Sequence, residues 1–137
     1  MEATKSGQDV NSRDRESQDV DSQEDGRDVN VSELTGWDIV HVDGAEWMPW
    51  TGAGGEARAK VLGTADGYAV VLVEAHAGYR GTPHVHGHAE FNYVLTGSVR
   101  NQGVEMRAGD GYAAAAGSSH DDFATDTGAT YLVIFRI

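Results

Sequence analysis

From Leu34 to the C-terminus, short runs of β-branched and aromatic residues alternate with turns that contain glycine, such as Asp66-Gly67 and Thr96-Gly97. No stretch of ten or more residues carries the apolar repeat of an amphipathic helix. Many short strands at this spacing are typical of a sandwich or a closed barrel. The pattern therefore predicts an all-β domain, with strands at 37–42, 59–62, 68–75, 90–95, 103–107, 111–116 and 130–137.

The first 33 residues differ from the rest of the chain. They hold 10 acidic and 4 basic side chains, and they contain no aromatic residue, leucine or isoleucine. Such a segment buries too little apolar surface to offset the entropy lost on ordering. We therefore expect a disordered acidic tail at 1–33 and a folded domain at 34–137; a docking function for the tail is the alternative.

Charge and cysteine content argue against several classes of function. The chain has 22 acidic and 10 basic side chains, with no basic stripe to neutralise phosphates, so we expect no binding to nucleic acid or to an anionic membrane. It has no cysteine, which excludes disulfides, thiolate zinc sites and iron–sulfur clusters. Neither a secretory signal nor an apolar run of membrane-spanning length is visible, so we expect a cytoplasmic protein.

Residues 84–90 carry the strongest signal for chemistry. On an extended strand, alternate side chains share one face, so His84 and His86 project in the same direction. Two imidazoles in this register can reach one metal ion, each at about 2.0–2.1 Å. Glu90 has the same parity and offers a carboxylate. The alternative is a pair of exposed histidines on a strand.

This stretch resembles the first motif of the cupin superfamily, in which a glycine, a His-x-His pair, a glutamate and a second glycine follow at set intervals. The chain reads Gly78, five residues, His84-Val85-His86, three residues, Glu90, six residues and Gly97. Every defined position of that motif is present.

The second cupin motif is also recognisable, with two departures. Its glycines and its histidine correspond to Gly109, Gly117 and His120. Ala115 and Ala124 stand where the family has proline and asparagine. These two positions are structural in the family, so their change leaves the implied metal site intact.

The resemblance implies a jelly-roll β-barrel that binds one divalent transition metal through His84, His86, Glu90 and His120. Iron(II) is the expected ion, although manganese, nickel, cobalt and zinc suit the same ligands. A glutamate ligand that detaches can act as a base, which makes Glu90 the candidate catalytic residue. The resemblance also implies a homodimer.

Five further residues near the two motifs are candidates for a substrate pocket. His88 shares the parity of the expected ligands, but a position at the surface or beside the ligands is favoured over a fifth ligand. Tyr93 has the opposite parity to Glu90, so it points outward unless a bulge intervenes. A plain core role is the alternative for the aromatic members of the set. The candidates are His88, Phe91, Tyr93, Tyr112 and Phe123.

The segment before the first motif, including Trp47-Met48-Pro49-Trp50, resembles the group that contains the ChrR sensor domain and the acetylacetone-cleaving dioxygenases. This resemblance implies a non-haem iron dioxygenase that cleaves a small dicarbonyl or hydroxy-ketone. The sensors in this group carry a cysteine-containing domain, and this chain has no cysteine, which favours the enzyme. A non-catalytic metal-binding or ligand-sensing cupin, and a metal-dependent isomerase or lyase, are the alternatives.

Overall fold

The computed structural model describes residues 29–30 and 33–137. Apart from residues 29, 30 and 33, the predicted acidic tail lies outside the described residues. The chain divides into two compact units, Met1–Thr35 and Gly36–Ile137. Within the described part of the first unit, the N–H of Glu33 donates to the carbonyl of Asn30 at 3.0 Å.

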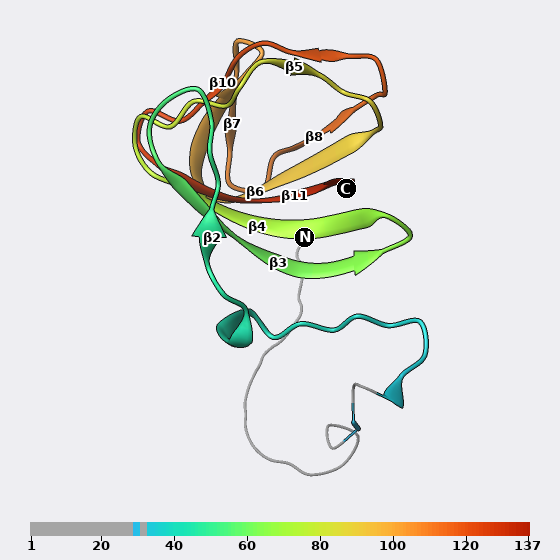
Figure 1. Ribbon diagram of the computed structural model, residues 1–137. Coiled ribbons are helices and arrows are strands. Elements are labelled where there is room, and N and C mark those ends of the chain that lie inside the picture. The colour runs from blue at the N-terminus through green and yellow to red at the C-terminus, as the bar shows by residue number, and fades with distance from the viewer. Residues whose placement is uncertain (1–28, 31–32) are drawn as a thin grey trace. The chain divides into compact units, whose positions relative to one another are not determined.

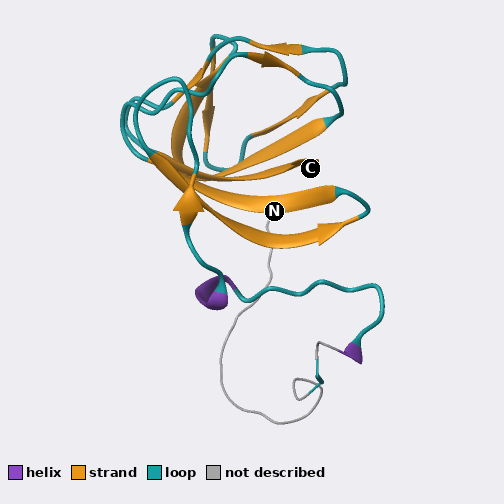
Figure 2. Cartoon of the chain, in the orientation of Figure 1, coloured by secondary structure: helices purple, strands orange, loops and turns teal. Residues whose placement is uncertain are grey.

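The second unit consists of antiparallel strands preceded by a 3-10 turn, η4 (Val42–Gly44) (Figures 1 and 2). No α-helix occurs among the described residues, and none of their helical segments has the length and apolar composition needed to cross a bilayer. The strands are β2 (Met48–Pro49), β3 (Ala57–Ala65), β4 (Tyr68–Ala75), β5 (His84–Val85), β6 (Glu90–Asn101), β7 (Val104–Arg107), β8 (Gly111–Ala114), β9 (Ser119–His120), β10 (Phe123–Ala124) and β11 (Ala129–Arg136).

One long strand, β6, organises the fold. The main sheet has the order β10-β6-β11-β4-β3-β2, and β7 and β8 also pair with β6, while β5 and β9 form a separate pair. The first half of β6 pairs with β8 and β11, and its second half pairs with β7 and β10. Because its partners change along its length, the sheet curls around a common interior as a half-barrel (Figure 1). The all-β barrel prediction is confirmed.

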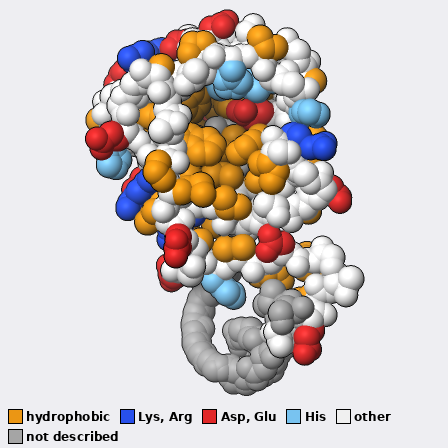
Figure 3. All heavy atoms as spheres, in the orientation of Figure 1, with side chains coloured by type: hydrophobic (Ala, Val, Ile, Leu, Met, Phe, Trp, Pro, Cys, Tyr) orange, Lys and Arg blue, Asp and Glu red, His pale blue; other side chains and the backbone are white. Residues whose placement is uncertain are grey.

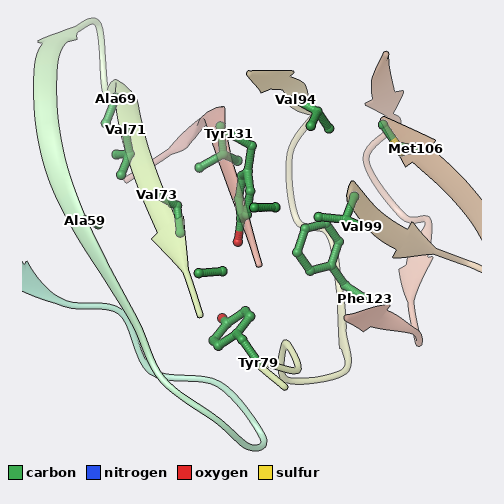
Figure 4. Close-up of a cluster of buried hydrophobic side chains, with 13 residues drawn as sticks. Ala59, Ala69, Val71, Val73, Tyr79, Val94, Val99, Met106, Phe123 and Tyr131 are labelled. Atoms are coloured by element: carbon green, nitrogen blue, oxygen red, sulfur yellow. The ribbon is translucent and has the colours of Figure 1, made fainter. Parts of the chain in front are cut away.

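The core follows from strict alternation along the strands. On β4, Ala69, Val71, Val73 and Ala75 are buried, whereas the residues between them are partly exposed. Successive side chains on a strand point to opposite faces, so this pattern turns one face of β4 inward. The inward side chains of the curled sheet meet one another in the interior, where Figure 4 shows the rings of Tyr79, Phe123 and Tyr131 together. Each fully buried valine contributes about 1.5–3 kcal/mol of hydrophobic stabilisation.

Two of the predicted turns behave differently. Asp66 and Gly67 have φ angles of 52° and 80°, which is the left-handed pair of a tight hairpin between β3 and β4, as predicted. Thr96-Gly97, by contrast, is not a turn and lies inside β6. Gly97 has φ of 76° and pairs with Ala129, two residues from Leu95, which the register shift between β6 and β11 leaves without a partner. The glycine therefore lies beside a bulge in a continuous strand.

The strand predicted at 37–42 is wrong. Its pattern alternates suitably, but it does not pair with a neighbour, and Val42 begins the 3-10 turn. The segment contacts β3 through side chains instead: the Asp38 carboxylate accepts the N–H of Thr64 at 2.8 Å, and Lys60 Nζ donates to the carbonyl of Val42 at 2.7 Å. The short strands β2, β5, β9 and β10 lie outside the predicted strand ranges, because two-residue strands carry too little pattern to be recognised.

Candidate metal centre

Two short strands bring the two histidine motifs together. Strand β5 pairs with β9 so that His84 lies directly opposite His120. His86 follows His84 by two residues and has the same side-chain direction. The ligand atoms of His84, His86 and His120 all lie within 4.8 Å of one another, which is close enough for one ion to reach all three.

The hydrogen bonds of His86 determine which of its nitrogens is free. The hydroxyl of Ser118 donates to the carbonyl of Ala115 at 2.6 Å. Because the Ser118 hydroxyl has given away its only proton, its oxygen accepts the Nδ1 proton of His86, at 3.0 Å. That leaves a lone pair on Nε2 of His86, which is buried and has no hydrogen-bond partner.

Hydrogen bonds also fix the rings of the other two histidines, although His120 uses the opposite ring nitrogen. Nδ1 of His84 donates to the carbonyl of Thr82 at 2.8 Å, which leaves Nε2 free. Nε2 of His120 donates to Oδ1 of Asn101 at 2.7 Å, and its Nδ1 is then buried without a partner. Burial lowers the pKa of His120, while the charge of Glu90 opposes that shift, so the ring favours the neutral form that can bind a cation.

Three free ring nitrogens that converge within the protein fit a divalent transition metal. Buried polar atoms are nearly always satisfied, so the unpartnered Nε2 of His86 and Nδ1 of His120 call for an electron acceptor between them. Hydrogen bonds from the opposite ring nitrogens are the usual support of metal-binding histidines, because they fix tautomer and orientation. The predicted three-histidine cluster is thus present in the fold.

Glu90 lies beside this cluster. Its Oε1 is 3.4 Å from Nε2 of His86, and its Oε2 accepts the hydroxyl proton of Tyr112 at 2.5 Å. A lone pair and a carboxylate oxygen this close are best satisfied by a cation between them. Among the described residues, however, the group whose ligand atoms lie within 4.8 Å contains only the histidines, so ligation by Glu90 stays a prediction.

Strand register explains how Tyr112 reaches Glu90. Tyr112 on β8 is directly opposite Asn92 on β6, and Glu90 is two residues away on the same face of β6. Diagonal neighbours in an antiparallel pair are within reach of a long aromatic side chain. Burial, reinforced by the hydrogen bond and charge of Glu90, raises the pKa of Tyr112 well above its usual range. Tyr112 therefore keeps its proton and acts as a donor.

A cavity of about 290 Å³ opens beside the histidines. His84, His120 and Glu90 contribute to its wall, and the remaining lining is mostly aromatic and apolar. Figure 3 shows a hollow with a hydrophobic floor and with histidine and acidic side chains at its edge. The full lining is Trp50, Thr51, Tyr79, Gly81, Thr82, His84, Glu90, Asn92, Tyr112, His120, Phe123, Tyr131, Val133 and Phe135.

The five candidate pocket residues divide into three groups. Tyr112 and Phe123 line the cavity. Phe91 and Tyr93 do not: they are 44% and 48% exposed on the opposite face of β6, as their parity requires. His88 is exposed and lines a second hollow of about 200 Å³, on which His84, His86 and Glu90 also border.

Sequence reasoning missed three residues that support the site: Asn92, Asn101 and Ser118. Asn92 carried a usable signal, because it is a polar residue at an inward position of β6, two residues after Glu90. Asn101 and Ser118 carried none, since each reaches its histidine through a long-range contact.

Comparison with solved structures supports the fold. The acetylacetone dioxygenase from Acinetobacter johnsonii aligns with a TM-score of 0.67 at 14% identity, covering 80% of each chain. A candidate acetylacetone dioxygenase from Methylibium petroleiphilum PM1 gives a TM-score of 0.67 at 20% identity, covering 73% of this chain and 76% of that one. At these identities the likeness establishes the fold alone.

A regulatory protein is similar as well. The structure of Rhodobacter sphaeroides SigE in complex with the anti-sigma ChrR aligns with a TM-score of 0.56 at 22% identity, over 69% of this chain and 51% of that one. A comparison with curated protein sequences gave no match. Residues 36–136 match the family described as the ChrR cupin-like domain, which covers well over half of the chain. The protein is therefore a cupin and belongs to the ChrR cupin-like domain family.

Proposed function

We propose that this protein is a mononuclear non-haem iron(II) dioxygenase that cleaves a carbon–carbon bond of a small dicarbonyl or hydroxy-ketone. The observation that carries the proposal is the position of His84, His120 and Glu90 in the wall of an apolar cavity of about 290 Å³. Structural metal sites are closed, whereas catalytic sites keep an open position next to a substrate pocket. The similarity in fold to acetylacetone dioxygenases supports the same proposal.

In this proposal the three histidines hold the metal through Nε2 of His84, Nε2 of His86 and Nδ1 of His120. A bound divalent iron ion would supply Lewis acidity and exchangeable positions for a chelating substrate and for dioxygen. The carbonyl of Thr82, Ser118 and Asn101 keep each ring in the required tautomer. Iron is proposed over manganese, nickel, cobalt and zinc because the reaction consumes dioxygen.

Glu90 has two proposed roles, as the fourth ligand and as the base that removes a proton from the substrate. The hydroxyl of Tyr112 occupies Oε2, so Oε1, which faces His86, is the atom available for either role. The Tyr112 hydrogen bond holds the Glu90 side chain in place. A glutamate carboxylate at this position can accept the acidic proton between two carbonyl groups.

The cavity wall would orient the substrate and exclude water. Phe123, Val133 and Phe135 provide apolar surface around the polar groups at the metal end. Exclusion of water strengthens every electrostatic interaction with a charged substrate enolate and protects reactive species from hydrolysis. A cytoplasmic location remains part of this proposal.

The test is oxygen uptake by protein loaded anaerobically with iron(II), with pentane-2,4-dione and hydroxyacetone as substrates. We expect uptake that depends on iron and substrate, that is absent from the zinc-loaded protein, and that falls at least about 100-fold in His86→Ala. His76→Ala is the matched control, because His76 is an exposed histidine near Glu56, outside the cluster. Tightly held native zinc together with no oxygen uptake by the iron form would overturn the proposal.

A non-catalytic ligand-sensing cupin is the second candidate. It is favoured by the match to the ChrR cupin-like family and by the similarity to the ChrR structure in the SigE complex. In that case the same cavity binds a small molecule without turning it over. Saturable binding of a ketone by iron-loaded protein that consumes no oxygen would favour this candidate.

A further inference from the structure

Apart from the expected ligand His120, Asn92 is the one residue in the lining of the 290 Å³ cavity with a buried side-chain atom that lacks a hydrogen-bond partner. Its side chain lies on the inward face of β6, two residues after Glu90, and the residue is 6% exposed. It lines the cavity beside the histidine cluster. Its Oδ1 is buried and has no hydrogen-bond partner among the described residues.

The neighbouring tyrosine fixes the orientation of this amide. Tyr112 has one hydroxyl proton and gives it to Oε2 of Glu90, so its oxygen can only accept further hydrogen bonds. The side chain of Asn92 lies beside that hydroxyl, across the β6–β8 pair, and lowers the pKa of Tyr112, as an N–H group near a phenol oxygen does. The amide nitrogen is therefore the group that suits Tyr112, and Oδ1 is left as a buried, unpartnered acceptor in a residue of the cavity wall.

The charges around the cavity restrict what can meet this acceptor. None of the residues that line it, all of which are described, is lysine or arginine. Glu90 contributes a carboxylate close to the metal end. A carboxylate on the substrate would gain no cationic partner from the wall and would be repelled by Glu90. The cavity thus suits a ligand that is uncharged away from the metal and has its own O–H or N–H donor.

We propose that Asn92 determines specificity by accepting a hydrogen bond from the hydroxyl group of a small, uncharged hydroxy-ketone. The inference rests on the proposed function and narrows its substrate class, because a β-diketone has no such donor once it has lost its acidic proton. A buried acceptor discriminates strongly against ligands that leave it unpaired.

The experiment compares two ligands that differ in this donor. Hydroxyacetone and methoxyacetone share the same carbonyl group and the same oxygen position, but methylation removes the O–H. Binding of each is measured by calorimetry to zinc-loaded protein, which needs no oxygen and no turnover. We expect hydroxyacetone to bind at least about tenfold more tightly than methoxyacetone.

Two variants test the role of Asn92. Asn92→Leu has nearly the same shape without the acceptor, and we expect it to lose the preference for hydroxyacetone while keeping zinc affinity and unfolding temperature. Asn92→Asp keeps an acceptor oxygen and should keep the preference, which preserves the test if the leucine variant fails to fold.

Equal binding of both ketones by the unmodified protein, binding of neither, or an undiminished preference in Asn92→Leu would overturn the inference. Oxygen uptake by the iron form with pentane-2,4-dione and hydroxyacetone decides the proposed function separately. A protein that oxidises the diketone but ignores the hydroxyl group would keep its proposed function and lose this specificity.

Discussion

Asn101 lies on β6, outside both histidine motifs, and yet its Oδ1 accepts the Nε2 proton of His120 at 2.7 Å. His84 and His86 use Nδ1 for their hydrogen bonds, so they present Nε2 to the cluster, whereas His120 presents Nδ1. The orientation of His120 therefore depends on a single amide. Removing the hydrogen-bond partner of a ligand histidine, on the ring nitrogen that does not bind the metal, typically weakens metal affinity by about 10–100-fold.

Replacing Asn101 should weaken metal binding without removing any ligand. We expect Asn101→Leu to bind zinc about 10–100-fold more weakly, because the His120 ring loses the acceptor that fixes its tautomer. Asn101→Asp keeps an acceptor and should stay within a few-fold of the unmodified protein. Competition with a chromophoric chelator measures both affinities. Unchanged affinity in Asn101→Leu would show that the ring is held by other contacts.

The histidines could be predicted from the sequence because their spacing is local. His84 and His86 share a strand face by parity alone, and His120 is recognisable from its motif. The supporting hydrogen bonds could not be predicted, since Asn101 meets His120 only after β6 and β10 have paired. The outward position of Tyr93 followed from its parity, whereas the position of Tyr112 next to Glu90 depends on the register of β8.

At the level of the strands, Gly97 is the position where β6 is most constrained. It has φ of 76°, and a Cβ atom added there would overlap the carbonyl oxygen of Gly128. Gly103, in the hairpin between β6 and β7, has a similar φ of 79°, but an added Cβ would have no atom within 4 Å. A substitution at Gly103 therefore tests left-handed backbone strain alone, whereas one at Gly97 tests that strain together with steric overlap.

Alanine at these two glycines should therefore have unequal effects on stability. We expect Gly103→Ala to lower the free energy of unfolding by about 1–2 kcal/mol, the cost of left-handed backbone. Gly97→Ala adds displacement of the Gly128 backbone and should cost about 3 kcal/mol or more. Urea denaturation measures both values. Equal losses would mean that β6 shifts freely at Gly97 and that the bulge is not constrained.

Strand prediction succeeded where burial enforces alternation and failed where it does not. The run at 68–75 coincides with β4, because one of its faces is buried along its whole length. Residues 37–42 show a similar pattern, but side-chain contacts of Asp38 and backbone contacts of Val42 replace a strand ladder there. Whether such a segment becomes a strand depends on pairing with a strand that is distant in the sequence. The local pattern of residues does not contain that information.

For the whole molecule, the homodimer stays a prediction. The outward face of β6 exposes Phe91, Tyr93 and Leu95, at 44%, 48% and 39%. Contiguous exposed apolar side chains of this kind are typical of an interface. Sedimentation equilibrium should give twice the chain mass of 14.6 kDa, and the double variant Phe91→Asp/Tyr93→Asp should sediment as a monomer. Val104→Asp, at a site 63% exposed on β7, is the control. A monomeric unmodified protein would contradict the prediction.

The assignment of His84, His86 and His120 as the ligands of one divalent metal ion is decided by the metal content of the protein, measured by mass spectrometry. We expect one ion per chain in the unmodified protein and in His76→Ala, and loss of the ion in His84→Ala, His86→Ala and His120→Ala. Binding should also raise the unfolding temperature by about 5 °C or more when the free metal exceeds its Kd a hundredfold. Full metal occupancy in all three alanine variants, or no binding of iron, manganese, nickel, cobalt or zinc by the unmodified protein, would contradict the claim.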